Sequence, residues 1–288
     1  MHITLYQLLL AFISFSSFAQ IKTTIVDGST NEPIPYVNVS IEGKGIELSA
    51  DENGLLQLPQ TDGSAIIHLS AVGFANAAIK FSDIKTTIPL ATKPIELGEI
   101  AIGNKKRQNS LVINPIKKAK DTWMGVGGGN NGTLLFAKYI LYKTEYASKY
   151  IDKLKFKVLA YNDNTFNVRL YTANTDGSPG DYLYNENILV KVKKGQKNAD
   201  VDFSKVSIIV PDEGFFVVIE YLAIPENRLD GSSKDIGFPA HLYGYGPSFM
   251  SEFGDAQEGW SYKQGKWTAH PKTERGYARM VIEVTLTD

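Results

Sequence analysis

The chain has 288 residues, of which 43% are hydrophobic and 21% are charged, and its formal net charge is −1. This length has room for two domains, because one domain usually takes about 100–200 residues. The small net charge creates no global field that would recruit nucleic acid or an anionic membrane. Cysteine is absent, which excludes disulfides, thiolate metal sites and cysteine nucleophiles.

The N-terminal segment predicts a cleavable export signal over residues 1–19. Leu5 to Phe18 is almost wholly apolar, and Ser17-Phe18-Ala19 supplies the small residues that a signal peptidase needs before Gln20. The alternatives are a buried first strand or an N-terminal membrane helix, but a spanning helix needs about 20 apolar residues. We therefore expect a protein in the periplasm, at the outer membrane or on the cell surface, with no membrane span after cleavage.

Residues 20–102 predict a small β-sandwich domain. Residues 36–41 alternate polar and apolar side chains, as expected for a half-buried strand. Pro33 and Pro35 hold the preceding segment extended, because proline fixes φ and restricts the residue before it. The sequence Asp51-Glu52-Asn53-Gly54 predicts a turn in which the glycine adopts a positive φ at little cost.

The order of these segments resembles the carboxypeptidase regulatory-like domain, a non-catalytic module common in exported proteins of Bacteroidetes-type bacteria. The resemblance rests on four segments, which are Ile21–Asp27, Gly28–Ile41, Ser49–Leu58 and Ile66–Phe74. It implies a prealbumin-like sandwich of seven strands.

Pro94–Ile102 resembles the closing strand that leads from this same domain into the plug of TonB-dependent outer-membrane transporters. The residues that follow are too few for a barrel of about 22 strands at about 10 residues per strand. This excludes a transporter and leaves an accessory to outer-membrane nutrient uptake as an alternative function.

Residues 103–122 form the most basic stretch of the chain. Its cationic residues are Lys105, Lys106, Arg107, Lys117, Lys118 and Lys120. We interpret the stretch as a linker between two domains, with one short helix from Pro115 to Trp123. The alternative is a patch that binds an anionic glycan or a lipid head group.

Residues 123–288 predict a second antiparallel β-sandwich or jelly roll, so the expected fold class is all-β. Apolar residues alternate with lysines over residues 153–158, and with polar residues over residues 166–171. The nearly continuous apolar run from Gly214 to Ile224 predicts a central strand buried on both faces. Residues 260–267 predict a hairpin that turns at Gln264-Gly265. The segment from Phe166 to Leu183 resembles a strand-turn signature of bacterial surface β-sandwich domains.

No pattern in the sequence predicts catalytic, cofactor-binding or zinc-binding residues. Gly127–Gly132 matches G-x-G-x-x-G, but a strand rather than a helix is expected after it, which does not suit a dinucleotide. His68, His241 and His270 lack the spacing of a zinc peptidase. Ser248 lacks the second glycine of a nucleophile elbow.

Two loops of the second sandwich carry the oxygen ligands that Ca²⁺ prefers. These residues are Asp163, Asp176 and Asp181, with Asn162, Asn164 and Asn174. Turn chemistry explains the same residue types without a metal, and we predict no metal here.

Residues 238–267 gather aromatic rings among glycines and polar residues, and they form the best candidate recognition surface. The candidate ligand-binding residues are Tyr243, Tyr245, Trp260, Tyr262 and Trp267. Exposed tyrosine and tryptophan rings stack on the C–H faces of sugars or anchor a protein partner. The alternative is that these rings pack the core of the sandwich.

We therefore expect a non-enzymatic protein of the cell envelope that acts as an interaction or glycan-binding module. Its partner would be a polysaccharide or an envelope protein. The alternatives are an accessory to nutrient uptake and a glycan or peptide hydrolase without a recognisable motif. An enzyme needs a concave site with convergent acid and base groups, whereas a binder needs only an aromatic or polar face.

The export prediction is tested by the mass of the mature chain. Intact-mass measurement of protein purified from the cell envelope should give a chain that starts at Gln20, because cleavage is expected after Ala19. A mature protein that retains Met1 would contradict the prediction.

Overall fold

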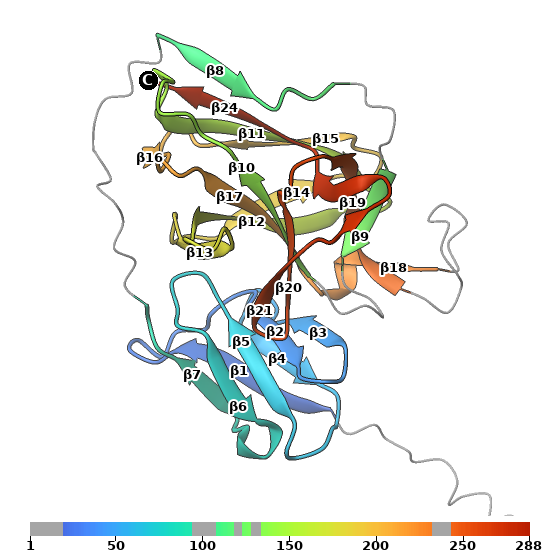
Figure 1. Cartoon of the computed structure of the whole chain (residues 1–288). Helices are drawn as coiled ribbons and strands as arrows, with labels where there is room; N and C mark the ends of the chain where they lie inside the picture. Colours follow the sequence, from blue (N-terminus) through green and yellow to red (C-terminus); the bar gives the residue numbers. More distant parts are fainter. Residues whose placement is uncertain (1–19, 94–107, 118–122, 128–133, 232–242) are drawn as a thin grey trace, which may run out of the picture.

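The computed structural model describes residues 20–93, 108–117, 123–127, 134–231 and 243–288 (Figure 1). The predicted signal at residues 1–19 and the segment Pro94–Ile102 lie outside the described residues. The described part of the chain is built from β-strands with two short 3-10 helices, so the predicted all-β class is confirmed. None of its helices has the length and apolar character needed to cross a membrane.

The first domain is a sandwich of seven strands in two sheets, as predicted. One sheet has the order β4-β1-β7 and the other β3-β2-β5-β6. The strands are β1 (Ile21–Asp27), β2 (Asn38–Ile41), β3 (Ile46–Ser49), β4 (Leu55–Leu58), β5 (Ile66–Ser70), β6 (Ala77–Lys80) and β7 (Thr87–Leu90). Strand β7 runs parallel to β1, and the other pairs are antiparallel.

The turn between β3 and β4 shows how the local sequence fixes this domain. The Asp51 carboxylate accepts hydrogen bonds from the backbone N–H groups of Asn53 (2.8 Å) and Leu55 (2.9 Å). Gly54 has a φ of +69°, and a Cβ there would lie 2.8 Å from the carbonyl oxygen of Ile25. Both the backbone angle and the close approach of β1 therefore require glycine at this position.

The second domain is a larger sandwich of two sheets. The seven-stranded sheet has the order β13-β12-β17-β10-β20-β21, with β14 paired to β12. Its strands are β10 (Leu135–Ile140), β12 (Asn164–Ala173), β13 (Pro179–Tyr182), β14 (Ile188–Val192), β17 (Phe215–Tyr221), β20 (Gly259–Lys263) and β21 (Lys266–Ala269).

The facing ten-stranded sheet has the order β22-β23-β19-β11-β24-β8. In addition, β15 and β16 pair with β11, whereas β9 and β18 pair with β19. Its strands are β8 (Ser110–Ile113), β9 (Trp123–Gly127), β11 (Tyr150–Leu159), β15 (Asn198–Asp202), β16 (Ile208–Ile209), β18 (Arg228–Asp230), β19 (Tyr243–Gly254), β22 (Lys272–Thr273), β23 (Gly276–Met280) and β24 (Ile282–Thr287).

The core of the second domain lies between its two sheets. Phe156, Phe166 and Phe249 meet there edge to face, with ring centroids 4.9 to 6.1 Å apart. All seven residues of β17 are buried, which confirms the predicted central strand. The predicted hairpin at Gln264-Gly265 also forms, and both of its turn residues have positive φ, at 49° and 78°.

The linker region differs from its prediction in two ways. The helix expected from Pro115 to Trp123 is wrong for its described residues, because residues 115–117 are not helical and Trp123 begins β9. Strand β8 forms within the predicted linker and pairs with β24, where Thr285 lies opposite Val112. The open edge of β24 thus provides hydrogen-bond partners that local sequence patterns do not reveal. Most of the basic residues of this stretch lie outside the described residues.

A charged pair is buried on the face of β12 and β17 that points away from the sandwich core. The Arg169 guanidinium donates to the Glu220 carboxylate at 2.8 Å through Nε and at 2.5 Å through Nη2, and both side chains are almost fully buried. Asn167 donates to the same carboxylate at 2.9 Å, and the Tyr182 hydroxyl accepts from Arg169 at 3.0 Å. Burial raises the pKa of Glu220, and the guanidinium counteracts this effect.

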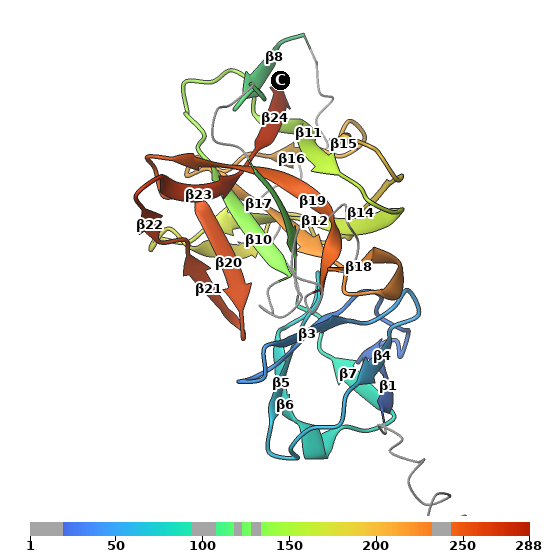
Figure 2. The ribbon, with the colours of Figure 1, turned by 90° about the vertical axis from the view of Figure 1, so that its right-hand side faces the viewer.

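The two domains touch through several side chains and through the β20–β21 hairpin, which extends toward the first domain in both views (Figures 1 and 2). Val72 packs into the hydrophobic core of the second domain. The backbone N–H of Ala223 donates to the Ser49 hydroxyl at 2.9 Å. At the hairpin tip, a Cβ on Gly265 would lie 3.3 Å from Nδ1 of His68. The first domain is therefore docked onto the second.

Removing one member of the buried charged pair should be costly. Glu220→Ala or Arg169→Ala leaves a buried charge without its counterpart and should lower the free energy of unfolding by about 3–5 kcal/mol. The double variant Arg169→Met/Glu220→Leu should lose much less, because no charge stays buried. Urea unfolding measures the free energy of unfolding of the single and the double variants. Lys193→Ala is the control, since its ion pair with Asp163 is exposed and screened by solvent, so its loss should change stability little. A Glu220→Ala loss as small as that of the control would contradict the expectation.

The stability of the fold should depend on the protonation of Glu47. Burial raises the pKa of this carboxyl to about 8, although Lys263 on the hairpin lowers it. The unfolded chain therefore loses this proton at a lower pH than the folded chain, and stability should fall as the pH rises from about 4.5 through 8. In Glu47→Gln that part of the pH dependence should disappear, as measured by urea unfolding across this range. Glu32→Gln, at an exposed position of the same domain, should keep the wild-type profile. An unchanged profile in Glu47→Gln would refute this assignment.

A candidate ligand-binding cavity at the domain junction

One face of the seven-stranded sheet carries a continuous cross-strand row of side chains. The strand register places Asn167, Glu220, Leu135, Tyr262 and Trp267 in this row. Directly paired residues project to the same side of a sheet, and neighbours along a strand project to opposite sides. The row therefore lies on the face opposite to Phe166 and the sandwich core, which we call the outer face.

The outer face is concave. Tyr171 on β12 and Trp267 on β21 are separated by three intervening strands, and four spacings of about 4.8 Å would place them about 19 Å apart in a flat sheet. Their ring centroids are nevertheless only 5.8 Å apart. The twist of the sheet and the reach of the two side chains together bring these rings into contact above the outer face.

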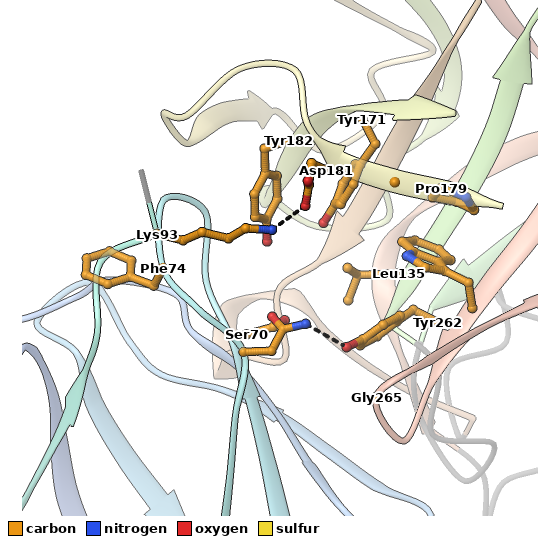
Figure 3. A pocket seen from close by; sticks show the side chains of 13 residues that line it. Ser70, Phe74, Lys93, Leu135, Tyr171, Pro179, Asp181, Tyr182, Tyr262 and Gly265 are labelled. Atoms are coloured by element: carbon orange, nitrogen blue, oxygen red, sulfur yellow. Dashed lines mark hydrogen bonds and ion pairs between the residues drawn. The ribbon is translucent and has the colours of Figure 1, made fainter. Parts of the chain in front are cut away.

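A cavity of about 200 Å³ lies between this concave face and the first domain (Figure 3). Its aromatic lining comes from Phe74, Tyr171, Tyr182, Tyr262 and Trp267. The Tyr262 and Trp267 rings are 5.1 Å apart at 60°, and the Tyr171 and Tyr182 rings are 4.6 Å apart at 40°. Two pairs of rings thus form part of the walls of one small cavity.

Polar groups line the same cavity. Lys93 of the first domain forms an ion pair with Asp181, which follows Gly180 in β13 (Figure 3). Asn76 donates to the Tyr262 hydroxyl at 3.5 Å, again across the domain boundary. Ser70 also lines the cavity, although its hydroxyl oxygen is itself buried and has no hydrogen-bond partner among the described residues. The cavity therefore combines apolar ring faces with hydrogen-bonding groups from both domains.

The structure separates the five predicted ligand-binding residues into groups. Tyr262 and Trp267 line the cavity, while Trp260 lies on the same face but packs on Phe216 at 6.3 Å and is not part of the lining. Tyr243 and Tyr245 lie on β19 of the other sheet, 6.0 Å apart. Tyr243 is half-buried beneath the Arg228 guanidinium, 4.3 Å from its ring, and Tyr245 is only 7% exposed. His241 lies outside the described residues.

Sequence reasoning missed three rings of the cavity. Phe74 follows β5 in the first domain, and Tyr171 and Tyr182 belong to β12 and β13. The strand-turn segment from Phe166 to Leu183 contains the two tyrosines, but its pattern indicates only a fold. Only the docked arrangement of the domains brings Phe74 beside them.

A second, larger groove of about 730 Å³ also lies between the domains. Tyr245 and Arg228 line it from the second domain, and Tyr36 lines it from the first. Burial raises the pKa of Tyr36, and the carboxylates of Glu52, Asp51 and Glu226 add to this effect. Asp51 and Glu52 therefore make the first-domain wall acidic, while the second-domain wall carries Glu226 beside the cations Lys191 and Arg228.

The loop residues weighed as calcium ligands have protein partners instead. Asp163 accepts from Lys193 at 2.7 Å, Asp176 caps the backbone of Ser178 at 2.9 Å, and Asp181 pairs with Lys93. Across the described ranges, no group of three or more His, Cys, Asp or Glu side chains is arranged to hold a metal.

Two serines bear on the alternative of a hydrolase. Ser248 is buried in β19. Ser261 and His270 form a pair that the sequence does not suggest, with 2.7 Å between Oγ and Nε2, and His270 Nδ1 lies 2.8 Å from the carbonyl oxygen of Ala278. Neither Ser261 nor His270 lines the cavity or the groove described above. Within the sheet, each of these two polar side chains provides the other with a hydrogen-bond partner.

Comparison with solved structures yields distant likenesses. The chain resembles the cysteine protease and lectin-like domains of Cwp84, a surface-layer-associated protein of Clostridium difficile, at 12% identity and a TM-score of 0.36, over 60% of this chain and 37% of that one. A structure of a variant of the Clostridial cysteine protease Cwp84 after propeptide cleavage matches at 10% identity and a TM-score of 0.39, over 94% of this chain and 66% of that one.

A third likeness is to carbohydrate-binding modules of the β-sandwich superfamily, at 10% identity and a TM-score of 0.20, over 81% of this chain and 94% of that one. At these TM-scores none of the three carries an argument about function. No curated protein matches the chain.

The family comparison agrees with the first domain of the structure. Residues 21–102 match the family model described as a CarboxypepD_reg-like domain. This range begins with β1 and includes all seven strands of the first sandwich. Residues 21–102 of this chain are therefore a carboxypeptidase regulatory-like domain.

Proposed function

We propose that this chain is an exported, non-catalytic module that binds glycans in the cavity at the domain junction. The observation that carries the proposal is the convergence of five aromatic rings and several hydrogen-bonding groups on one small cavity. Binding sites for small molecules combine these two elements, an apolar lining and a few placed polar groups.

The chemistry of the lining suits a sugar. A sugar ring presents C–H faces that stack on aromatic rings, and hydroxyl groups at its edge that need donors and acceptors. Tyr262 and Trp267 offer ring faces, while Lys93 and Asp181 offer a donor and an acceptor next to each other. Aromatic hydroxyls and the indole N–H add further polar atoms at the edges of the apolar surface.

A non-catalytic role is supported by the charges in the cavity. Its charged lining residues, Lys93 and Asp181, form an exposed ion pair with each other. Glycoside hydrolysis commonly uses two carboxyl groups on either side of the scissile bond. Among the described lining residues, Asp181 is the one carboxylate.

The cellular setting is part of the proposal. The predicted signal at residues 1–19 and the regulatory-like domain both support export to the envelope. The partner would be a polysaccharide or a glycan-bearing envelope protein. An accessory role in outer-membrane nutrient uptake is compatible with such a module.

The proposal is tested by removing one cavity ring and comparing it with a neighbour of the same type. Trp267→Ala should weaken binding to a responsive polysaccharide by about 1 kcal/mol or more, which is about fivefold, because an anchoring ring is lost. Trp260→Ala is the matched control, since Trp260 is half-buried on the same outer face but lies outside the cavity lining. Affinity gel electrophoresis and calorimetry on folded protein measure the difference. Equal binding by both variants would rule out the cavity as the site.

A further inference from the structure

The β20–β21 hairpin carries two of the cavity rings next to its tip. Tyr262 and Trp267 lie opposite each other, and Lys263 and Lys266 form the last pair before the turn. Among the described residues, β10 pairs with β20 no further than Leu135, which lies opposite Tyr262. Strand β21 is the edge of its sheet. The tip therefore projects beyond the neighbouring strand, toward the first domain (Figures 1 and 2).

The tip is weakly stabilised by the hairpin alone. Its two lysines lie directly opposite each other, and like charges in this position destabilise strand pairing. A hairpin without further packing is only marginally stable. Residues 263–266 are exposed, so little in the described part of the second domain holds them in place. Because Tyr262 and Trp267 adjoin the tip, an opening of the tip would move both rings.

The first domain supports the tip on one side. A Cβ on Gly265 would lie 3.3 Å from Nδ1 and 3.8 Å from Cγ of His68, so the turn lies against this ring. The Nε2 atom of His68 lies 3.3 Å from the Glu42 carboxylate, which helps to orient the ring. Asn76 donates to the Tyr262 hydroxyl at 3.5 Å. The first domain thus contacts the hairpin both at the turn and at one of the cavity rings.

The face of the first domain that meets the hairpin is polar. The strand register places Glu47 and His68 on either side of Ser40. Val39 points to the opposite side of this sheet, where it packs in the core of the first domain. Ser40 is nevertheless only 3% exposed. Polar contacts between domains permit relative motion more readily than large hydrophobic ones, so docking can control how firmly the hairpin is held.

We propose that the carboxypeptidase regulatory-like domain positions the binding rings of the second domain, because its docked face holds the tip of the β20–β21 hairpin and so fixes Tyr262 and Trp267 in the cavity. His68 is the positioning residue at the turn. The inference rests on the proposed glycan-binding function for its effect on affinity, whereas the state of the hairpin is measurable without a ligand.

Hydrogen exchange of the full chain, followed by mass spectrometry, tests the role of His68. In His68→Ala the peptides that cover residues 260–267 should lose protection, because the tip opens more often. Peptides from β17 should keep their protection. His68→Phe is the matched variant, since it retains a flat ring beside Gly265, and it should restore the protection of the hairpin. An equal loss of protection in β17 would mean that His68 stabilises the whole fold, and would overturn its assigned role.

A second variant undocks the first domain at a distance from the cavity rings. Val72 packs into the core of the second domain but does not line the cavity, and Val72→Glu places a carboxylate in this apolar contact. The hairpin should lose more protection than in His68→Ala. If about a tenth of the molecules stay docked, the affinity for a responsive polysaccharide should fall about tenfold. Val112→Glu is the control, because Val112 is 46% exposed on β8.

The outcomes separate this inference from the proposed function. If no glycan binds the wild-type chain, the proposed function fails, whereas the exchange of the hairpin still decides whether the first domain positions it. Unchanged exchange of the hairpin in His68→Ala and Val72→Glu would overturn the inference even if glycans bind. Faster exchange with undiminished glycan affinity would also overturn it, because the rings would then bind without being held. If Val72→Glu does not fold, His68→Ala and His68→Phe decide the question.

Discussion

The buried Arg169–Glu220 pair constrains the whole outer face of the seven-stranded sheet. Because both charges are removed from water, their remaining hydrogen-bonding atoms need partners within the protein. Asn167 and Tyr182 satisfy them, and Tyr182 lies on β13, which pairs with the edge of β12. A cavity of about 200 Å³ remains between this face and the first domain.

The first domain forms part of the cavity wall. Val72 packs into the core of the second domain, and Ser70 and Phe74 on either side of it line the cavity. A short segment of the regulatory-like domain is therefore both the docking contact and part of the candidate binding site. Any ligand that fills the cavity touches both domains, so it should also strengthen their association.

Local patterns predicted the strands well where a single rule decides the outcome. The turn residues Gln264 and Gly265 fix the hairpin, and the apolar run at β17 fixes a central strand. The same patterns wrongly predicted a helix from Pro115 and did not predict β8, which pairs with the edge of β24. They also could not show that Asn167 and Arg169, which alternate with apolar residues like a solvent-facing row, are buried. Polar residues at alternate positions have the same pattern whether water or another layer covers them.

By itself, the sequence determined the all-β class, the regulatory-like domain and the presence of an aromatic-rich segment that includes Tyr262 and Trp267. These properties depend on side-chain periodicity, turn residues and family-specific motifs, which are local in the chain. Only the tertiary structure decided which rings act together. Tyr243 and Tyr245 lie on the other sheet, whereas Phe74, Tyr171 and Tyr182 line the cavity from distant positions in the chain. The physical reason is that sheet curvature and domain docking arise from contacts between segments far apart in sequence, and no local pattern encodes them.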